Sequence, residues 1–329
     1  MNLILKYNSN VLNNYTNDDR PLMINRECSF KVLMVYLMPL VSLIGILSNG
    51  LSTIIFHNIL SDKTKKFVFL YSFKCLQAKS LYDLSLFLIH IFIPIYYVDS
   101  SANSLGSIVW YIYFYNYGES VFLFVSNIFE IISMLDFYTI ISNKSNIIKQ
   151  FRFIYVFLFV SIFGFLFNIL ILFRYQIVNT SNGYRDIKSN FYSTQLDRYL
   201  RFVETFIRDI LSLMIIFLIN LMMIVKMKKA SVKRQSLKLV NSVNLINKAH
   251  RKAFLMVFVV SLIYLIGRIP LMVYYLPFEK YETSLWQCYY NWSLLPYYLS
   301  YSLNIFIYYF YNKHFRDYFK KLCHIFIVD

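Results

Sequence analysis

Seven long apolar segments dominate this chain and limit what it can fold into. They lie at about 30–57, 68–98, 108–140, 153–173, 202–226, 251–276 and 289–311. Each approaches or exceeds the roughly 20 residues that an α-helix needs to cross a bilayer. In lipid, only helices and closed barrels satisfy their own backbone polar groups, and the 7 Gly and 6 Pro among 329 residues suit helices better than a turn-rich barrel. We therefore expect an all-α membrane protein with seven transmembrane helices.

The charges between these segments predict how the chain is oriented. The formal net charge is +16, and the basic residues form short runs between apolar segments. We assign these runs to membrane orientation rather than to nucleic-acid binding. The loops on one side carry twenty basic residues against three acids, and those on the other side carry ten against nine. The positive-inside rule then places the N-terminus outside a multi-pass protein of the cell membrane.

This orientation divides the chain into three parts. Residues 1–29 form an extracellular tail that is mostly polar and shows no signal peptide. Residues 30–311 form the seven-helix domain. Residues 312–329 form a cytoplasmic amphipathic helix and tail at the membrane surface.

Several expected modification sites follow from the same orientation. The glycosylation sequons at Asn14 and Asn179 both fall outside. Cys28 and Cys288 also fall outside, where we expect either a disulfide between the N-terminal tail and the last outer loop or two free thiols. Cys323 follows the amphipathic run and is placed for palmitoylation, although an inert thiol explains it equally well.

Short motifs along the segments occur in the order found in one receptor class. They are Gly45-Ile46-Leu47-Ser48-Asn49, Ser80-Leu81-Tyr82-Asp83, Asp136-Phe137-Tyr138, Tyr264 to Pro270, Asn304 with Tyr308, and Asn312 with Phe315 and Arg316. Together they resemble the rhodopsin-like (class A) G-protein-coupled receptors. Leu218-Ile219-Asn220 and the final Asn-x-x-Phe-Arg are similar to invertebrate FMRFamide-type peptide receptors. The resemblance implies a bundle with an amphipathic eighth helix, an extracellular ligand of the neuropeptide kind, and a heterotrimeric G protein facing Asp136, Phe137 and Tyr138.

The chain departs from that receptor pattern at several positions. Phe137 stands where the family has the arginine that usually contacts the G protein. Ile305 replaces the helix-seven proline, so we expect a straighter seventh helix. The family's helix-three cysteine would lie near Ile112, and no cysteine occurs between Cys75 and Cys288. These departures keep two alternatives open: a seven-helix protein that binds ligand without G-protein signalling, and a membrane transporter or channel.

Ionisable residues inside the apolar segments are the main functional signal, because charges at bilayer depth are costly and usually face the bundle interior. On the third segment, Glu119, Ser126, Glu130 and Ser133 fall on one helical face. We expect Glu119, near the outer end, and Arg268, in place of the family's helix-six tryptophan, to bind a charged ligand such as a basic or amidated peptide. The alternative is that these two side chains only neutralise each other.

A second polar group is expected deeper in the bundle, where its members act as switch residues in the resembling receptors. It comprises Asn49, Lys79, Asp83, Glu130, Asn304 and Tyr308. Lys79 precedes Asp83 by four residues, the spacing at which helical side chains meet. We expect Lys79 to bridge Asp83 and Glu130 and to supply the cation that is sodium in the family; a static internal salt bridge is the alternative.

No catalytic arrangement is visible in the sequence. The five histidines lack metal-ligand spacing, and no phosphate-binding loop or nucleophile motif occurs. We therefore expect neither an enzyme nor a bound cofactor or metal. The expected partners are an extracellular ligand, a G protein and the lipid bilayer, with no nucleic acid.

Overall fold

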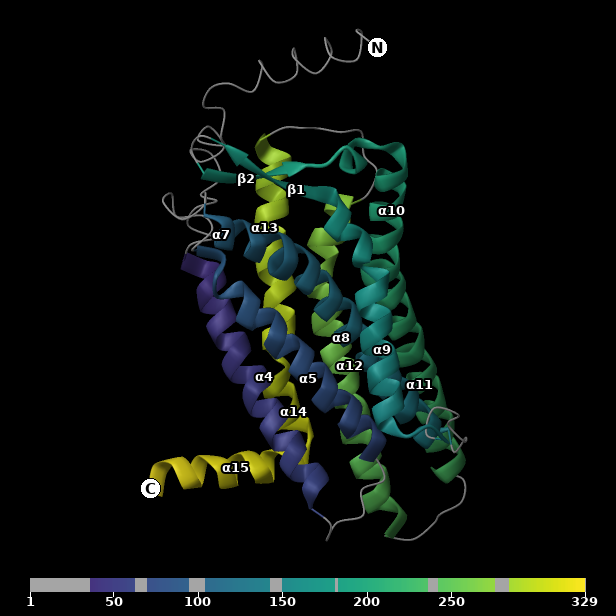
Figure 1. Ribbon diagram of the computed structural model, residues 1–329. Helices are drawn as coiled ribbons and strands as arrows, with labels where there is room; N and C mark the ends of the chain where they lie inside the picture. The colour runs from purple at the N-terminus through teal and green to yellow at the C-terminus, as the bar shows by residue number, and fades with distance from the viewer. Residues whose placement is uncertain are drawn as a thin grey trace.

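The computed structural model describes residues 36–62, 70–94, 104–142, 150–180, 183–235, 242–275 and 284–328. Helices make up most of these residues and run alongside one another as an elongated bundle (Figure 1). Seven helical rods can be followed in the described residues: α4 (Met38–Ser61), α5 (Leu70–His90), α7–η2–α8 (Leu105–Val109, Trp110–Gly118, Glu119–Ile141), α9 (Phe153–Phe167), α10–η6–α11 (Gln195–Thr205, Phe206–Leu211, Ser212–Gln235), α12 (Ser242–Tyr275) and α13–α14 (Ser284–Ser302, Asn304–Tyr311).

Four helices in the described ranges are long and apolar enough to cross a membrane: Met38–Ser61, Leu105–Ile141, Phe153–Arg174 and Gln195–Lys226. A shorter apolar stretch, Phe258–Val273, lies within α12. The rod α5 is less apolar because it carries Lys79, Asp83 and several serines, and these side chains are buried inside the bundle. The chain is thus a helical membrane protein with charged and polar side chains buried in its interior.

The outer surface of α9 is strongly apolar. Phe159 is 70% exposed and Leu166 60% exposed, which is costly in water but not against lipid chains. The opposite side of α9 packs on α8, where Val125 lies against Gly164. A layer of aromatic rings that includes Tyr82, Phe129 and Phe157 continues this contact towards α5.

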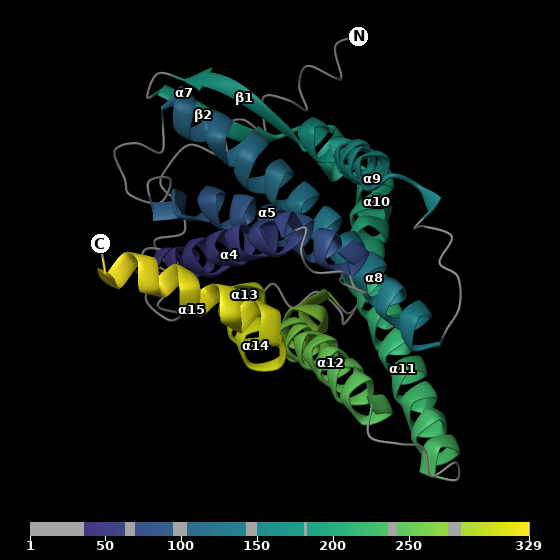
Figure 2. The ribbon, with the colours of Figure 1, turned by 90° about the horizontal axis from the view of Figure 1, so that it is seen from below.

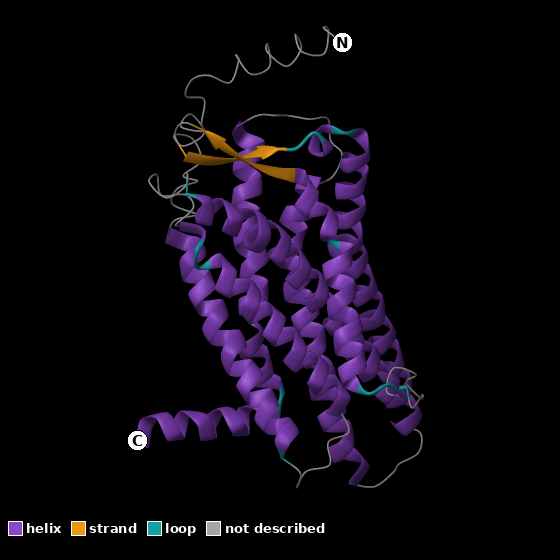
Figure 3. Cartoon of the chain, in the orientation of Figure 1, coloured by secondary structure: helices purple, strands orange, loops and turns teal. Residues whose placement is uncertain are grey.

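A β-hairpin, which the all-α expectation missed, lies across one end of the bundle (Figure 3). Strand β1 (Tyr175–Thr180) pairs antiparallel with β2 (Gly183–Lys188), with Tyr175 opposite Lys188 and Thr180 opposite Gly183. The sequence contains a signal for it, because Asn182-Gly183 between alternating residues is typical of hairpins.

Buried ion pairs hold the base of this hairpin. Arg174, at the end of the short 3-10 helix η4 (Ile169–Arg174), donates from Nε to Asp197 (2.7 Å) and from Nη2 to Glu204 (2.7 Å). Arg201 also faces Asp197 at 3.3 Å and stacks on Tyr192 of η5 (Phe191–Ser193). Both acids lie on α10, so the network ties the hairpin to the end of that helix.

The last rod is broken at Leu303, so the expectation of a straighter seventh helix is wrong. Helix α13 ends at Ser302 and α14 begins at Asn304. The backbone carbonyl of Tyr301 accepts hydrogen bonds from the side-chain amides of Asn304 (3.1 Å) and Asn49 (3.3 Å). Side-chain amides that bond to backbone carbonyls compete with the helix ladder, so the helix breaks without a proline.

Helix α15 (Lys313–Val328) turns away from the direction of the other helices (Figure 1) and lies beside α4 and α14 when seen from below (Figure 2). Phe315 at its start packs between Phe56 and Tyr308. The Tyr318 hydroxyl donates to the Asp62 carboxylate at the end of α4 (2.5 Å). These contacts fix the direction of α15.

Candidate functional site

The predicted polar face of the third rod points into the bundle. Ser126, Glu130 and Ser133 are buried, and Glu119 is partly buried. Glu119 directly follows η2, a π-helical segment of nine residues. A π-helix shifts the register of the residues that follow and is frequent at functional sites. The burial of these four side chains confirms the prediction that they share one helical face towards the bundle interior.

Glu119 contacts aromatic side chains near the hairpin end of the bundle. The hydroxyl of Tyr298, on α13, donates to its Oε1 atom. His90, the last residue of α5, places Nε2 3.5 Å from Oε2. The ring of His90 also packs on Tyr298 (4.4 Å) and Tyr115 (5.5 Å). The Glu119 side chain keeps 18% of its surface exposed.

Arg268 lies deeper, on α12, and is almost fully buried. Its Nη2 donates to Asn127 Oδ1 (2.5 Å) and to the Tyr301 hydroxyl. Its guanidinium also lies 5.3 Å from the Tyr301 ring and 5.5 Å from the Tyr264 ring, within cation–π range. No ion pair joins Arg268 to Glu119 in the described residues. The two predicted ligand residues therefore do not neutralise each other, and each has its own polar partners.

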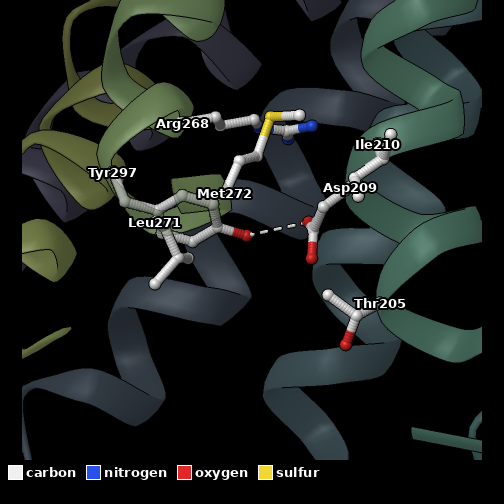
Figure 4. A pocket seen from close by; sticks show the side chains of 7 residues that line it. All are labelled: Thr205, Asp209, Ile210, Arg268, Leu271, Met272 and Tyr297. Atoms are coloured by element: carbon white, nitrogen blue, oxygen red, sulfur yellow. Dashed lines mark hydrogen bonds between the residues drawn. The ribbon is translucent and has the colours of Figure 1, made fainter. Parts of the chain in front are cut away.

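The cavity beside Arg268 is small. It is lined by Thr205, Asp209, Ile210, Arg268, Leu271, Met272 and Tyr297 (Figure 4). The space is about 10 Å³, roughly enough for one water molecule. Glu119 is not among the residues that line this cavity, and a polar cavity shared by Glu119 and Arg268 stays a prediction.

Asp209 belongs to this region, although the sequence alone gave it no role. It lies in the π-helical segment η6 and pairs with its neighbour Arg208 at 2.9 Å. The Tyr297 hydroxyl donates to its other oxygen (3.4 Å), as the dashed line in Figure 4 shows. Arg208 also donates to Ser120 (3.1 Å) and, through its carbonyl, accepts from Asn127 (3.0 Å). Asn127 thus links buried Arg268 to partly buried Arg208.

Lys79 and Asp83 form the predicted buried ion pair. Lys79 Nζ lies 2.5 Å from Asp83 Oδ2, and neither side chain has any exposed surface. Ser126 donates to the second Asp83 oxygen (2.5 Å). Lys79 also donates to the Tyr264 hydroxyl and lies 4.7 Å from that ring and 5.4 Å from the Tyr301 ring. The rings of Tyr264 and Tyr301 therefore each face two buried cations, Lys79 and Arg268.

Glu130 does not join this pair by a hydrogen bond, so the expected bridge from Lys79 to both acids is only half present. Both Glu130 oxygens are buried and have no hydrogen-bond partner among the described residues. The charges of Lys79 and Arg268 nevertheless act on this carboxyl group. Lys79 directs two of its three N–H donors to Asp83 and Tyr264.

The remaining members of the polar group gather around Tyr264 and Tyr301. Asn304 donates to the Tyr264 hydroxyl (2.9 Å). Asn49 donates to the carbonyl of Gly45 (3.0 Å) as well as to that of Tyr301. Tyr308 is buried, and its hydroxyl has no partner within the described part of the chain. All six predicted members are thus buried in the bundle interior.

At the end of the bundle opposite the β-hairpin, the residues expected to face a G protein are mostly hidden. Asp136 accepts hydrogen bonds from the backbone N–H (3.1 Å) and hydroxyl (2.5 Å) of Ser72 on α5. Phe137 has no exposed surface and belongs to the main apolar core. Only Tyr138 is partly exposed. In this state, therefore, Asp136 and Phe137 hold α8 to its neighbours rather than present a surface.

The structure describes only some of the predicted modification sites. Asn179 is exposed on β1, which suits a glycan. Cys288 is disulfide-bonded, whereas Cys75 and Cys323 are free thiols. Cys323 is partly exposed on α15. Asn14 and Cys28 lie outside the described residues.

Four tyrosines and one asparagine complete the site and were not assigned to it from sequence: Tyr264, Tyr297, Tyr298, Tyr301 and Asn127. Tyr297 and Tyr301 are four residues apart, and Tyr308 follows two turns later, so a helical face rich in tyrosine was readable. This tyrosine-rich face did not stand out because the chain has 30 tyrosines. Together with the charges, these hydroxyls allow hydrogen bonds to be exchanged between α5, α8, α12 and the α13–α14 rod.

No family model matches this chain, and no curated protein sequence matches it.

Proposed function

We propose that this protein is a divergent rhodopsin-like receptor that crosses the cell membrane seven times with its N-terminus outside. It would sense an extracellular peptide and signal to a heterotrimeric G protein. Seven helical rods of the bundle support the proposed spans. The rods α5, α12 and α13–α14 place charged and hydroxyl-bearing side chains against one another in the bundle interior, and ionisable side chains at membrane depth are usually functional.

The observation that carries the proposal is one connected polar network across the bundle. At one end of the network, Arg268 donates to the Tyr301 hydroxyl. The backbone carbonyl of the same tyrosine accepts a hydrogen bond from Asn304. From Asn304 it continues through Tyr264 and Lys79 to Asp83 and then Ser126. It joins α12, α13, α14, α5 and α8, which are the elements that must shift relative to one another in a two-state switch.

A network of this kind supports signalling because its hydrogen bonds can be redistributed. Arg268 keeps Nε and Nη1 without partners in the described residues, and Glu130 keeps both oxygens. A second arrangement in which these groups find partners would favour a different helix packing. A ligand that favours that arrangement shifts the population towards it.

The ligand we propose is cationic, with an amine or guanidinium group. The Glu119 side chain is partly exposed and its carboxylate contacts Tyr298 and His90, whose ring packs on that of Tyr115. A cation gains both a charge-assisted hydrogen bond and cation–π contact in such a setting. A bound cation would compete with the Tyr298 hydroxyl for the Glu119 carboxylate. Loss of that hydrogen bond would change the position of α13 beside Tyr297 and Tyr301.

The experiment that tests the ligand site is binding of amidated peptides with basic side chains to Glu119→Gln and Glu119→Asp variants. Glu119→Gln keeps the shape and removes the charge, and we expect affinity to fall by about tenfold or more. Glu119→Asp should retain part of the affinity. Equal affinity of Glu119→Gln and the unaltered chain for every peptide that binds would reject the role of Glu119.

A second candidate function, ligand binding without G-protein signalling, is favoured by Phe137. This side chain is fully buried in the core, whereas the receptor pattern has an exposed arginine there. In a G-protein dissociation assay, a silent receptor would bind peptide without a response, and Phe137→Arg would serve as the comparator. Peptide-driven dissociation by the unaltered chain would reject this second candidate.

A further inference from the structure

A large groove lies on the outside of the bundle, away from the polar site. It is enclosed by α4, α14 and α15 and has a volume of about 490 Å³. Leu47 and Leu51 from α4, Phe306 and Phe310 from α14, and Phe319 from α15 form most of its wall, and Ser48 and Tyr309 contribute the hydroxyl-bearing side chains. The volume is in the range of small-molecule sites.

The groove faces the bilayer. Leu47 is 58% exposed and Phe310 66% exposed, and α4 is one of the helices long and apolar enough to cross a membrane. Whatever occupies a cavity on such a surface must come from the lipid phase. The groove is also held open, because Tyr318 bonds to Asp62 and Tyr309 packs edge-on against Phe319 (5.3 Å). These contacts fix α15 at an angle to α4 and α14, so the corner between them cannot close.

The charge of α15, the helix that contributes Phe319 to the wall of the groove, indicates which lipid. Phe319 turns into the groove, and its helix carries four basic residues against one acid, Asp317, between residues 313 and 322. Lys313, Lys320 and Lys321 are exposed. A basic amphipathic helix at the membrane surface attracts anionic headgroups. An apolar groove that ends beside such a helix fits a molecule with an acyl chain and a negative head.

We propose that this groove is a binding site for one anionic phospholipid. One acyl chain lies between α4 and α14, and the phosphate head lies against the basic residues of α15. The site stabilises the angle between α15 and the bundle. It requires only that the bundle lies in a membrane, and it is independent of the proposed receptor activity.

The test uses the full chain in lipid nanodiscs that contain phospholipids with a photoreactive group on one acyl chain. Headgroups are either phosphatidylserine or phosphatidylcholine, and labelled peptides are mapped by mass spectrometry. Leu47→Trp fills the groove, and Leu43→Trp is the matched control, since Leu43 is an exposed leucine of the same helix that does not line it. Lys320→Glu removes the charge attraction, and Lys229→Glu is its control on α11, where Lys229 is exposed.

We expect labelling by the serine lipid to concentrate on α4 and α14 around the groove. Leu47→Trp and Lys320→Glu should each lower it about fivefold or more, and both controls should leave it unchanged. Equal labelling of the exposed face of α9, around Phe159, would show bulk lipid only and overturn the proposal. So would equal labelling by both headgroups, displacement by excess sterol but not by excess serine lipid, or crosslinks to a second copy of the chain in place of lipid.

Discussion

The buried pair between Lys79 and Asp83 makes the sharpest prediction about stability. Both side chains are fully buried, and the ammonium lies 2.5 Å from the carboxylate. Replacing Lys79 by methionine keeps the length and apolar volume of the stem but removes the charge. Asp83 then keeps Ser126 as its other hydrogen-bond partner and becomes an uncompensated buried charge. Removing one partner of a buried pair typically costs about 3–5 kcal/mol, and we expect Lys79→Met to fall in that range.

The companion variant Asp83→Asn should cost less. Lys79 would keep the Tyr264 hydroxyl and the two tyrosine rings, and its charge already acts on the Glu130 carboxyl. Glu130 has both oxygens free of hydrogen bonds among the described residues and can take over as the counter-ion. The double variant Lys79→Met/Asp83→Asn contains no unpaired charge at this position. We expect it to be more stable than Lys79→Met alone, with a coupling energy of about 2 kcal/mol or more.

Equilibrium unfolding in mixed detergent micelles, with sodium dodecyl sulfate as the denaturant, measures all three free energies. Lys74→Met is the matched control, because Lys74 lies on the same helix, is only partly buried and has no ion pair within the described residues. We expect this control to lie within about 0.5 kcal/mol of the unaltered chain. A Lys79→Met variant as stable as the control, or single effects that add in the double variant, would refute the reasoning.

Three other predictions concern the ends of the bundle and its tightest contact. Arg174→Gln leaves buried Glu204 without its ion-pair partner and Asp197 with Arg201 alone, so amide hydrogen exchange in the β1–β2 hairpin should speed up while exchange in α4 stays unchanged. Gly267→Ala should destabilise the chain by about 1–3 kcal/mol, because a Cβ there would lie 2.7 Å from the backbone carbonyl oxygen of Pro296. Gly106→Ala is the control: a Cβ there has no atom within 4 Å, so this variant should be close to neutral in the same unfolding assay. The Asp62 carboxylate accepts the hydrogen bond of Tyr318 and raises the pKa of that hydroxyl from 10.0 to about 12. Since the folded-state pKa is the higher one, docking of α15 should be intact below pH 10 and weaken as the pH rises towards 12, and Asp62→Asn should remove this shift in a difference titration against Tyr318→Phe.

Local spacing was enough to predict part of the site. The four-residue interval between Lys79 and Asp83 fixes their contact on one helix, and the same period places Ser126 and Glu130 on the inner face of α8. Such predictions hold because both partners lie on one rigid element. They need no knowledge of how the helices pack.

Contacts between distant segments were beyond this reasoning. The partners of Arg268 are Asn127 and Tyr301, which lie on two other rods, and the choice between them and Glu119 depends on helix rotation that no spacing reveals. Short π-helical segments before Glu119 and around Asp209 change that rotation further. The break at Leu303 has the same origin, because it depends on Asn49 reaching the Tyr301 carbonyl from α4.

The hairpin was missed for a different reason. Its strands are short and partly charged, so they do not register as apolar segments, and a survey based on membrane-spanning length passes over them. The network around Arg174 that holds the hairpin consists of ordinary charged residues far apart in the chain. Only their burial distinguishes them from solvated surface charges.

The central claim is that an outer ligand site acts through the buried network on the inner end of the bundle. Energy-transfer measurement of G-protein dissociation in cells that display the chain tests it directly. The stimuli are amidated peptides with basic side chains, and the comparators are Glu119→Gln and Phe137→Arg at matched surface expression. We predict that at least one peptide drives dissociation and that Glu119→Gln raises the required concentration by about tenfold or more. No dissociation from either the unaltered chain or Phe137→Arg, with any of these peptides, would contradict the account.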